Sequence, residues 1–346
     1  MNHIGIDLGR RVSQICILRE DGEMVERRIL SQPERYAAVL KPYRGRSRVL
    51  LEAGTESEWV ARCLEEQGHE VVVADPNYAP MYVHRQRRVK TDRRDARALA
   101  EACRLNLFRP AHRVSESQRQ VRWRINVREA LVRTRSRWIV LIGSLLRQAG
   151  IHRRGGAANT FLERLDADSL PEPMRQAIAP MLQVLEQLQE QIAAADGALV
   201  ELSRTDARVH RLDSVPGVGP VTAACFVALV DHVGRFSGPH QLEAYLGLVP
   251  REYSSGERQA RGSITKAGNT RLRCLLVEAA WSIMNYPRPE TLALREWTQR
   301  IALRRGMPRA VVALARRLAG ILFAMMRDNT FYDSARLAQG RRIRVA

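Results

Sequence analysis

The sequence has few cysteines, few lysines and no long apolar run. Its five cysteines are scattered, odd in number and never in a CxxC pair, which argues against a disulfide framework or a zinc site. No window of about eighteen uncharged apolar residues occurs, and the N-terminal MNHIGIDLG has neither the basic nor the apolar region of a signal peptide. We therefore expect a cytoplasmic protein with reduced cysteines and no membrane partner.

Negative charge is also scarce. The chain has 56 Lys and Arg against 37 Asp and Glu, a net charge of +19, and its only lysines are Lys41, Lys90 and Lys266. A codon bias toward arginine explains the shortage of lysine, but it does not explain an excess of cations over anions. Such a surface attracts polyanions by releasing their counterions. The composition therefore predicts nucleic-acid binding, and 346 residues suffice for two or three domains with cores of their own.

The first part of the chain reads as a mixed α/β domain. Alternating and continuous apolar runs predict five strands, and two longer periodic segments predict helices. The resulting order, ββββαβα, resembles the βββαβα order of an RNase H-like domain. The predicted strands are 3–8, 13–19, 23–30, 48–51 and 70–74, and the predicted helices are 57–67 and 92–104.

The rest of the chain reads as helical. An arginine-rich helix is predicted over 115–147, and a second, with apolar residues near heptad spacing, over 180–203. An antiparallel helical hairpin or coiled coil is the simplest interpretation of this pair. The sequence thus predicts an α/β domain followed by all-α parts. The expected domains are 1–110, a helical linker over 111–204, a C-terminal helical domain over 205–330 and a basic tail over 331–346.

Four carboxylates stand where this fold could bring them together. Asp7 ends the first strand, Glu52 ends the fourth, and Asp92 and Asp95 begin a helix. Oxygen-only ligands suit Mg²⁺ or Mn²⁺, which can stabilise both the attacking and the leaving oxygen in phosphoryl transfer. Two alternatives stay open, because Asp92 could be only a helix N-cap, and GIDLG also occurs in sugar-kinase and actin-like ATPases, which need a second glycine-rich phosphate loop.

Residues 212–229, LDSVPGVGPVTAACFVAL, predict a helix end, a tight turn and a new helix, as in a helix-hairpin-helix. In that motif glycines such as Gly217 and Gly219 let backbone N–H groups approach a DNA phosphate. A tight interhelical turn that packs without any ligand is the alternative.

Residues 246–280 contain a loop rich in small and basic residues that presents Ser254 and Ser255 before Gly256. A serine beside glycine usually marks only a turn. Its hydroxyl could instead attack phosphorus and form a phosphoserine link that keeps the bond energy for rejoining. The residues alone do not decide between these two interpretations.

The motifs GIDLG, LLEAG, VKTDRRDARALA, PGVGPVTAA, YLGLVPREYSSG and GSITKAGNTRLR occur in an order and spacing that resembles one family along almost the whole chain. That family is the DEDD insertion-sequence transposases of the Piv-invertase type, also called bridge-RNA-guided recombinases. A departure is LLEAGTES, where many relatives carry Glu-Ala-Thr-Gly, although Glu52 still matches.

The resemblance implies a function and a site. Asp7, Glu52, Asp92 and Asp95 would be the Mg²⁺-binding tetrad of a RuvC-like domain, and Ser255 would be the nucleophile that forms a 5′-phosphoserine intermediate. The expected partners are element and target DNA, a noncoding guide RNA encoded by the element, and further copies of the chain in a dimer or tetramer. The residues expected to contact nucleic acid are Arg85, Arg87, Arg88, Lys90, Arg119, Arg122, Arg124, Arg128, Gly217, Gly219, Arg258, Arg261, Lys266 and Arg271.

Two other functions compete with this one. A RuvC-like nuclease would hydrolyse DNA junctions with activated water and leave Ser255 as an accessory phosphate-binding residue. A scaffold that binds nucleic acid without cutting it would carry the carboxylates as vestiges. Formation of a covalent protein–DNA adduct separates the first alternative from the recombinase, and metal-dependent strand cleavage separates the second.

Overall fold

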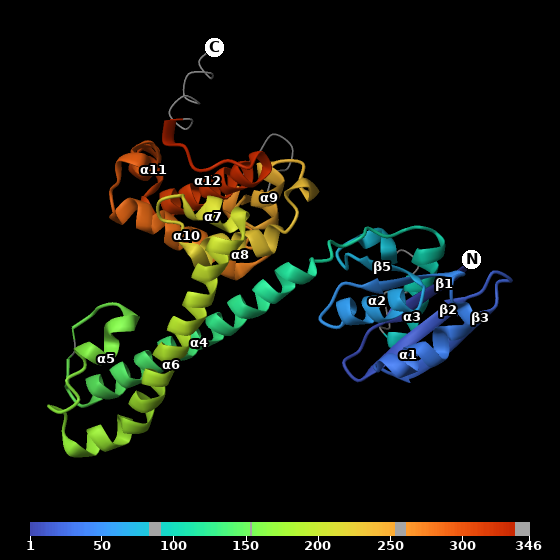
Figure 1. The fold of residues 1–346 in the computed structure, drawn as a ribbon, viewed down its shortest axis with the longest axis horizontal. Helices are drawn as coiled ribbons and strands as arrows, with labels where there is room; N and C mark the ends of the chain where they lie inside the picture. The colour runs from blue at the N-terminus through green and yellow to red at the C-terminus, as the bar shows by residue number, and fades with distance from the viewer. Residues whose placement is uncertain (83–90, 153, 253–260, 336–346) are drawn as a thin grey trace, which may run out of the picture. The chain divides into compact units, whose positions relative to one another are not determined.

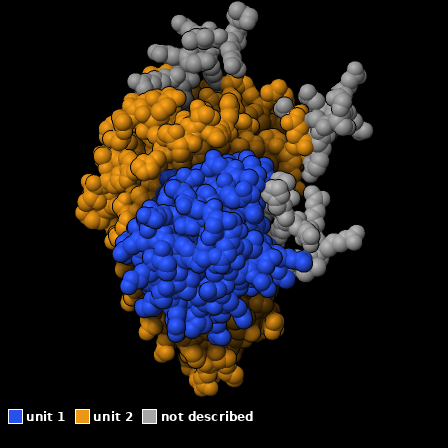
Figure 2. Space-filling view, turned by 90° about the vertical axis from the view of Figure 1, so that its right-hand side faces the viewer, with its two compact units in different colours: residues 1–114 blue, residues 115–346 orange. Residues whose placement is uncertain are grey.

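The computed structural model describes residues 1–82, 91–152, 154–252 and 261–335, and it divides into two compact units, Met1–Val114 and Ser115–Ala346 (Figure 2). Each unit has hydrophobic core clusters of its own. The second unit joins the helices expected as a linker over 111–204 to the helices that follow, because Val121, Ile125 and Leu199 from the former lie in the same core as the latter.

A five-stranded mixed sheet, in the order β3-β2-β1-β4-β5, is the centre of the first unit (Figure 1). The first three strands form an antiparallel meander, whereas β4 lies parallel to both β1 and β5. Parallel neighbours need a crossover connection, and two helices supply these. The strands are β1 (Asn2–Asp7), β2 (Val12–Leu18), β3 (Met24–Leu30), β4 (Ser47–Glu52) and β5 (Glu70–Ala74).

Helices cover both faces of this sheet. Side chains alternate along a strand, so Ile4 and Ile6 of β1 lie in the core under α1 (Pro33–Leu40) and α2 (Ser57–Glu66). Strand residues whose side chains point to the other face of the sheet, including Cys16, pack against α3 (Asp92–Arg104). Helix α1 is not among the predicted helices, because its eight residues are too few to show a clear helical period.

Two long antiparallel helices begin the second unit: α4 (Glu116–Gln148) and α6 (Glu172–Thr205), with the short α5 (Phe161–Arg164) between them (Figure 1). The buried apolar residues of α6 repeat every seven positions, at Ile178, Leu185, Ile192 and Leu199. This confirms the predicted helical pair, but α6 begins earlier than residue 180. Pro180 lies inside the helix, which continues through it.

The remaining helices form a separate bundle with the adjoining ends of α4 and α6. These helices are α7 (Ala207–Asp213), α8 (Pro220–Val230), α9 (Pro239–Tyr245), α10 (Thr270–Asn285), α11 (Leu292–Arg305) and α12 (Met307–Asp328). Between α9 and α10 the structure has a small antiparallel pair, β6 (Pro250–Glu252) and β7 (Arg261–Ile264), where the sequence analysis expected only a loop.

Candidate active site and nucleic-acid contacts

Asp7 and Glu52 lie at the same end of adjacent strands. Strands β1 and β4 are parallel, with Ile6 paired to Leu51, so the next residue of each strand reaches the same edge of the sheet. Both carboxylates also lie on the same face of the sheet. Side chains alternate along a strand, so Asp7 is on the face of Gly5 and Glu52 is on the face of Leu50, and Gly5 and Leu50 are paired neighbours. That face is the one covered by α3, since Leu50 packs with Leu99 in its core cluster.

The direction of α3 brings its first turn to this edge. Late in the helix, Cys103 Sγ lies 3.7 Å from His3 Nδ1, near the start of β1. Earlier in the helix, Ala96 lies against Gly5, further along the strand. Helix α3 therefore runs antiparallel to β1, and its N-terminal residues Asp92 and Asp95 lie toward the end of β1 where Asp7 stands.

Gly5 allows the helix and the strand to approach this closely. A Cβ atom on Gly5 would lie 2.2 Å from Ala96 O and 2.2 Å from Ala100 N, both backbone atoms of α3. No other residue fits without moving the helix. Gly5 has no predicted role from the sequence, although a glycine inside a strand is a known signal of close backbone approach.

The start of α3 is capped by Thr91, whose hydroxyl accepts from Arg94 N. The capping role that Asp92 could have had therefore belongs to its neighbour. Asp92 is exposed, whereas Asp95 is only 5% exposed. Two arginines of the same helix, Arg93 and Arg97, form ion pairs with Glu26 of β3 and hold α3 on the sheet.

The donor set suits a hard divalent cation, because it consists of carboxylate oxygens alone. Within the described ranges, no three His, Cys, Asp or Glu side chains are close enough together to hold a metal ion. The four carboxylates thus share one region of the first unit without forming a closed ligand set. A cavity of about 450 Å³ opens beside Asp7 and Glu52, lined also by Arg10, Thr55 and Glu56.

Ser255, Arg258, Arg85, Arg87, Arg88 and Lys90 lie outside the described residues, as does the side chain of Arg261. The structure does describe the base of the β6–β7 hairpin. Gly247 and Gly268, both with positive φ, bring its two ends close together, since a Cβ on Gly247 would lie 2.3 Å from Ala267 O. Lys266 is exposed and also has a positive φ, of 56°.

Arg273 holds this base together from α10. Its side chain is 8% exposed, and its guanidinium donates to Leu246 O at 3.0 Å and to Ala267 O at 2.6 Å. These two carbonyls precede and follow the hairpin. Arg273 lies in a predicted helix but has no predicted role, since nothing in the local sequence distinguishes it from Arg271.

Five of the arginines expected to contact nucleic acid have described side chains, and four of these have partners within the protein. Arg122 donates to Ala228 O at 2.9 Å and to Leu229 O at 3.2 Å, at the end of α8, and burial lowers its pKa. Arg271 is paired with Glu129 at 2.8 Å. Arg119 and Arg128 form ion pairs with Glu116 and Asp196. Of the four expected in α4, Arg124 is exposed and has no ion pair to a described carboxylate.

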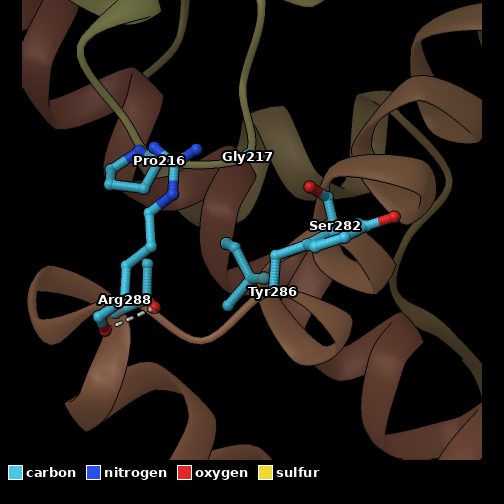
Figure 3. A pocket seen from close by; sticks show the side chains of 7 residues that line it. Pro216, Gly217, Ser282, Tyr286 and Arg288 are labelled. Atoms are coloured by element: carbon cyan, nitrogen blue, oxygen red, sulfur yellow. Dashed lines mark hydrogen bonds between the residues drawn. The ribbon is translucent and has the colours of Figure 1, made fainter.

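The helix end, tight turn and new helix predicted over residues 212–229 are present as α7, the 214–219 turn and α8. Gly217 has a φ of 90°, and a Cβ there would lie 2.9 Å from Ile283 Cγ1 of α10. Interhelical packing therefore explains Gly217. Figure 3 shows the cavity of about 50 Å³ beside this turn, with the Arg288 side chain extending toward Pro216. Gly219, which precedes α8, has open space where a Cβ would be.

Comparisons with known proteins agree with both units. The model for the Transposase IS116/IS110/IS902 family matches residues 209–294, and the model for a DEDD transposase of the IS110 type matches residues 4–151. The chain is 33% identical to a probable family 20 transposase of Pseudomonas aeruginosa, over 96% of this chain and 98% of that one. It is 29% identical to the transposase for insertion sequence element IS1111A of Coxiella burnetii, over 95% and 90% of the two chains.

A sheet edge with carboxylates, in a chain that aligns with transposases along nearly its whole length, defines an enzyme of DNA transposition. The chain belongs to the IS116/IS110/IS902 family of transposases. Its DEDD domain indicates dependence on a divalent metal ion, and its family implies that it binds DNA. No helix in the described part of the chain has the length and apolarity needed to cross a bilayer.

Proposed function

We propose that this transposase cuts and rejoins DNA strands between an insertion element and its target through a covalent link to Ser255. The first unit is an RNase H-like, RuvC-type domain that holds Mg²⁺ or Mn²⁺ with Asp7, Glu52, Asp92 and Asp95. The observation that carries the proposal is the position of Asp7, Glu52 and the first turn of α3 at one end of one sheet face.

The chemistry is an exchange of phosphoester bonds. The Ser255 hydroxyl attacks a phosphorus atom of the DNA backbone and gives up its proton, a Ser–O–P bond forms, and the bond to the 3′ oxygen breaks. That oxygen leaves as a 3′ hydroxyl. Attack by the 3′ hydroxyl of another strand then reverses the step and frees the serine. A divalent metal held by the carboxylates would stabilise the negative charge that develops on the phosphate oxygens.

The partners form part of the same proposal. A noncoding RNA from the element pairs with element and target DNA, so that base pairing supplies the sequence specificity. The chain acts as a dimer or tetramer. The basic residues of the segments around positions 85–90 and 258–266 contact the nucleic-acid backbone, together with Arg124 and the N–H groups beside Gly219.

The test is to incubate the full chain with Mg²⁺, element-end and target DNA, with and without the RNA transcribed beside the element, and to look for an SDS-resistant protein–DNA adduct. We expect an adduct that is absent in Ser255→Ala and in Asp7→Asn and is retained in the control Ser254→Ala. Free cleaved ends without an adduct, undiminished in Ser255→Ala, would instead establish a hydrolytic nuclease. An adduct that forms equally without the RNA would remove the guide from the proposal.

Metal binding is tested separately from activity. Calorimetric titration of Mn²⁺ into the full chain should give binding that is lost in Asp7→Asn and kept in Asp21→Asn, because Asp21 lies in the turn after β2, whose last residue Leu18 pairs with His3 at the other end of β1. Equal Mn²⁺ binding by both variants would exclude Asp7 as a ligand.

A further inference from the structure

Four arginines gather where α11 meets α12. Arg300, Arg304 and Arg305 belong to the last turns of α11, and Arg309 belongs to the first turn of α12 (Figure 1). All four are exposed, and every residue from 303 to 309 is exposed. Arg309 Nη1 lies 3.5 Å from Arg305 O, so the two helices present their cations at one place. We call these four residues the α11–α12 corner.

The nearest acidic residue along the chain is Glu296, one turn before Arg300, and Arg300 Nε donates to its backbone carbonyl. Residues 297–327 include seven arginines and neither Asp nor Glu. Two others of the seven are used inside the protein, since Arg316 pairs with Glu243 and Arg317 lies over the Trp297 ring. The four corner arginines form no ion pair with any carboxylate that the structure describes. In α4, by contrast, four arginines form ion pairs or donate to distant carbonyls: Arg119, Arg122, Arg128 and Arg133.

Such a cluster opposes folding in the isolated protein. Arg300 and Arg304 are four residues apart on one helix, a spacing at which like charges repel. Cations at the end of α11 gain from the helix dipole, but Arg309 stands in the first turn of α12, where the dipole opposes a cation. Helix dipoles therefore account for part of the corner only. A bound polyanion would compensate the remaining repulsion.

We propose that the α11–α12 corner binds the phosphodiester backbone of duplex DNA. Guanidinium groups form charge-assisted, often bidentate hydrogen bonds with phosphate oxygens. Hydrogen bonds of this kind position a protein on the duplex without reading its sequence. Duplex DNA is the polyanion that a transposase must engage at both element and target. The corner thus supplies backbone affinity from the second unit, independently of Ser255 and of the carboxylates.

The test measures how binding depends on salt. A fluorescein-labelled duplex DNA of random sequence is titrated with the full chain at several salt concentrations, without divalent metal. The test variant is Arg304→Gln/Arg305→Gln/Arg309→Gln. The control, Arg62→Gln/Arg175→Gln/Arg204→Gln, removes the same charge from arginines that are each paired with a glutamate three or four residues away on the same helix.

We expect the slope of log K against log salt to fall by about 0.9 for each phosphate that the corner variant no longer binds, and to stay unchanged in the control. Both variants should keep the thermal unfolding midpoint of the parent, because the substituted side chains are at the surface. An equal fall in both slopes would mean that the lower net charge alone weakens DNA binding, and it would overturn the proposal. So would an unchanged slope on duplex DNA with a reduced slope on single-stranded RNA, which would assign the corner to RNA.

Discussion

Substitution of Gly5 by alanine tests whether the approach of α3 to β1 builds the carboxylate site. The added Cβ would lie 2.2 Å from two backbone atoms of α3, more than 1 Å closer than an ordinary contact of 3.4 Å. Neither atom is the end of a flexible side chain, so the helix itself must move. Overpacking of this kind costs roughly 1–3 kcal/mol, and the rigid neighbours here place the expected loss near the upper end, at about 3 kcal/mol.

The control substitution, Gly197→Ala, should change the stability in the opposite direction. Gly197 lies exposed inside α6, and nothing stands within 4 Å of a Cβ built there. Alanine at this position should stabilise the protein by up to about 1 kcal/mol, because glycine is the poorer helix former. Urea unfolding of both variants gives the two free energies, and metal-dependent strand cleavage should fall in Gly5→Ala alone. A Gly5→Ala variant as stable and as active as the parent would refute the role of the close approach.

Three further outcomes follow from single side chains. Hydrogen bonds from Arg97, and to a smaller extent from Arg93, lower the pKa of the Glu26 carboxyl, whereas burial opposes this shift. Because the pKa is lower in the folded protein, the carboxylate stabilises the fold above about pH 4.3. This stabilisation is lost as the pH falls further. The difference in unfolding free energy between the parent and Glu26→Gln should accordingly shrink on acidification, and a difference independent of pH would contradict this. Arg273→Ala leaves two carbonyls without their charged donor and should cost roughly 2–3 kcal/mol in urea unfolding, whereas an unchanged midpoint would mean that the hairpin base needs no clamp. Arg122→Met should lower stability by a similar amount through the end of α8 and leave the salt dependence of DNA binding unchanged; a reduced slope would show that Arg122 also binds phosphate.

Much of the first unit could be predicted from local patterns. The five strands and the helices α2 and α3 come from runs of apolar residues whose period is short, so a few residues suffice to identify each. Asp7 and Glu52 follow from the same patterns, since each ends an apolar run. Helix α1 was missed because eight residues do not complete enough turns to show a period, and its first residue is a proline.

The roles of the arginines could not be predicted in this way. Arg122 and Arg124 are two residues apart on one helix and look alike in sequence, yet one is hydrogen-bonded to the end of α8 and the other is exposed. Whether a cation is paired depends on carboxylates and carbonyls that lie far along the chain. The carbonyl that accepts from Arg122 is 106 residues away. Arg273, which joins the two sides of the hairpin, was missed for the same reason.

By itself, the sequence determined the excess of positive charge, the five strands of the first unit with α2 and α3, and the set of motifs, because each depends on residue type and short spacing. Only the tertiary structure decided that α3 lies antiparallel to β1 with Gly5 at the closest approach, which arginines are neutralised within the protein, and that four of them remain without ion pairs to described carboxylates where α11 meets α12. Those features depend on close approach and on screening between distant segments, and neither is set until the chain has folded.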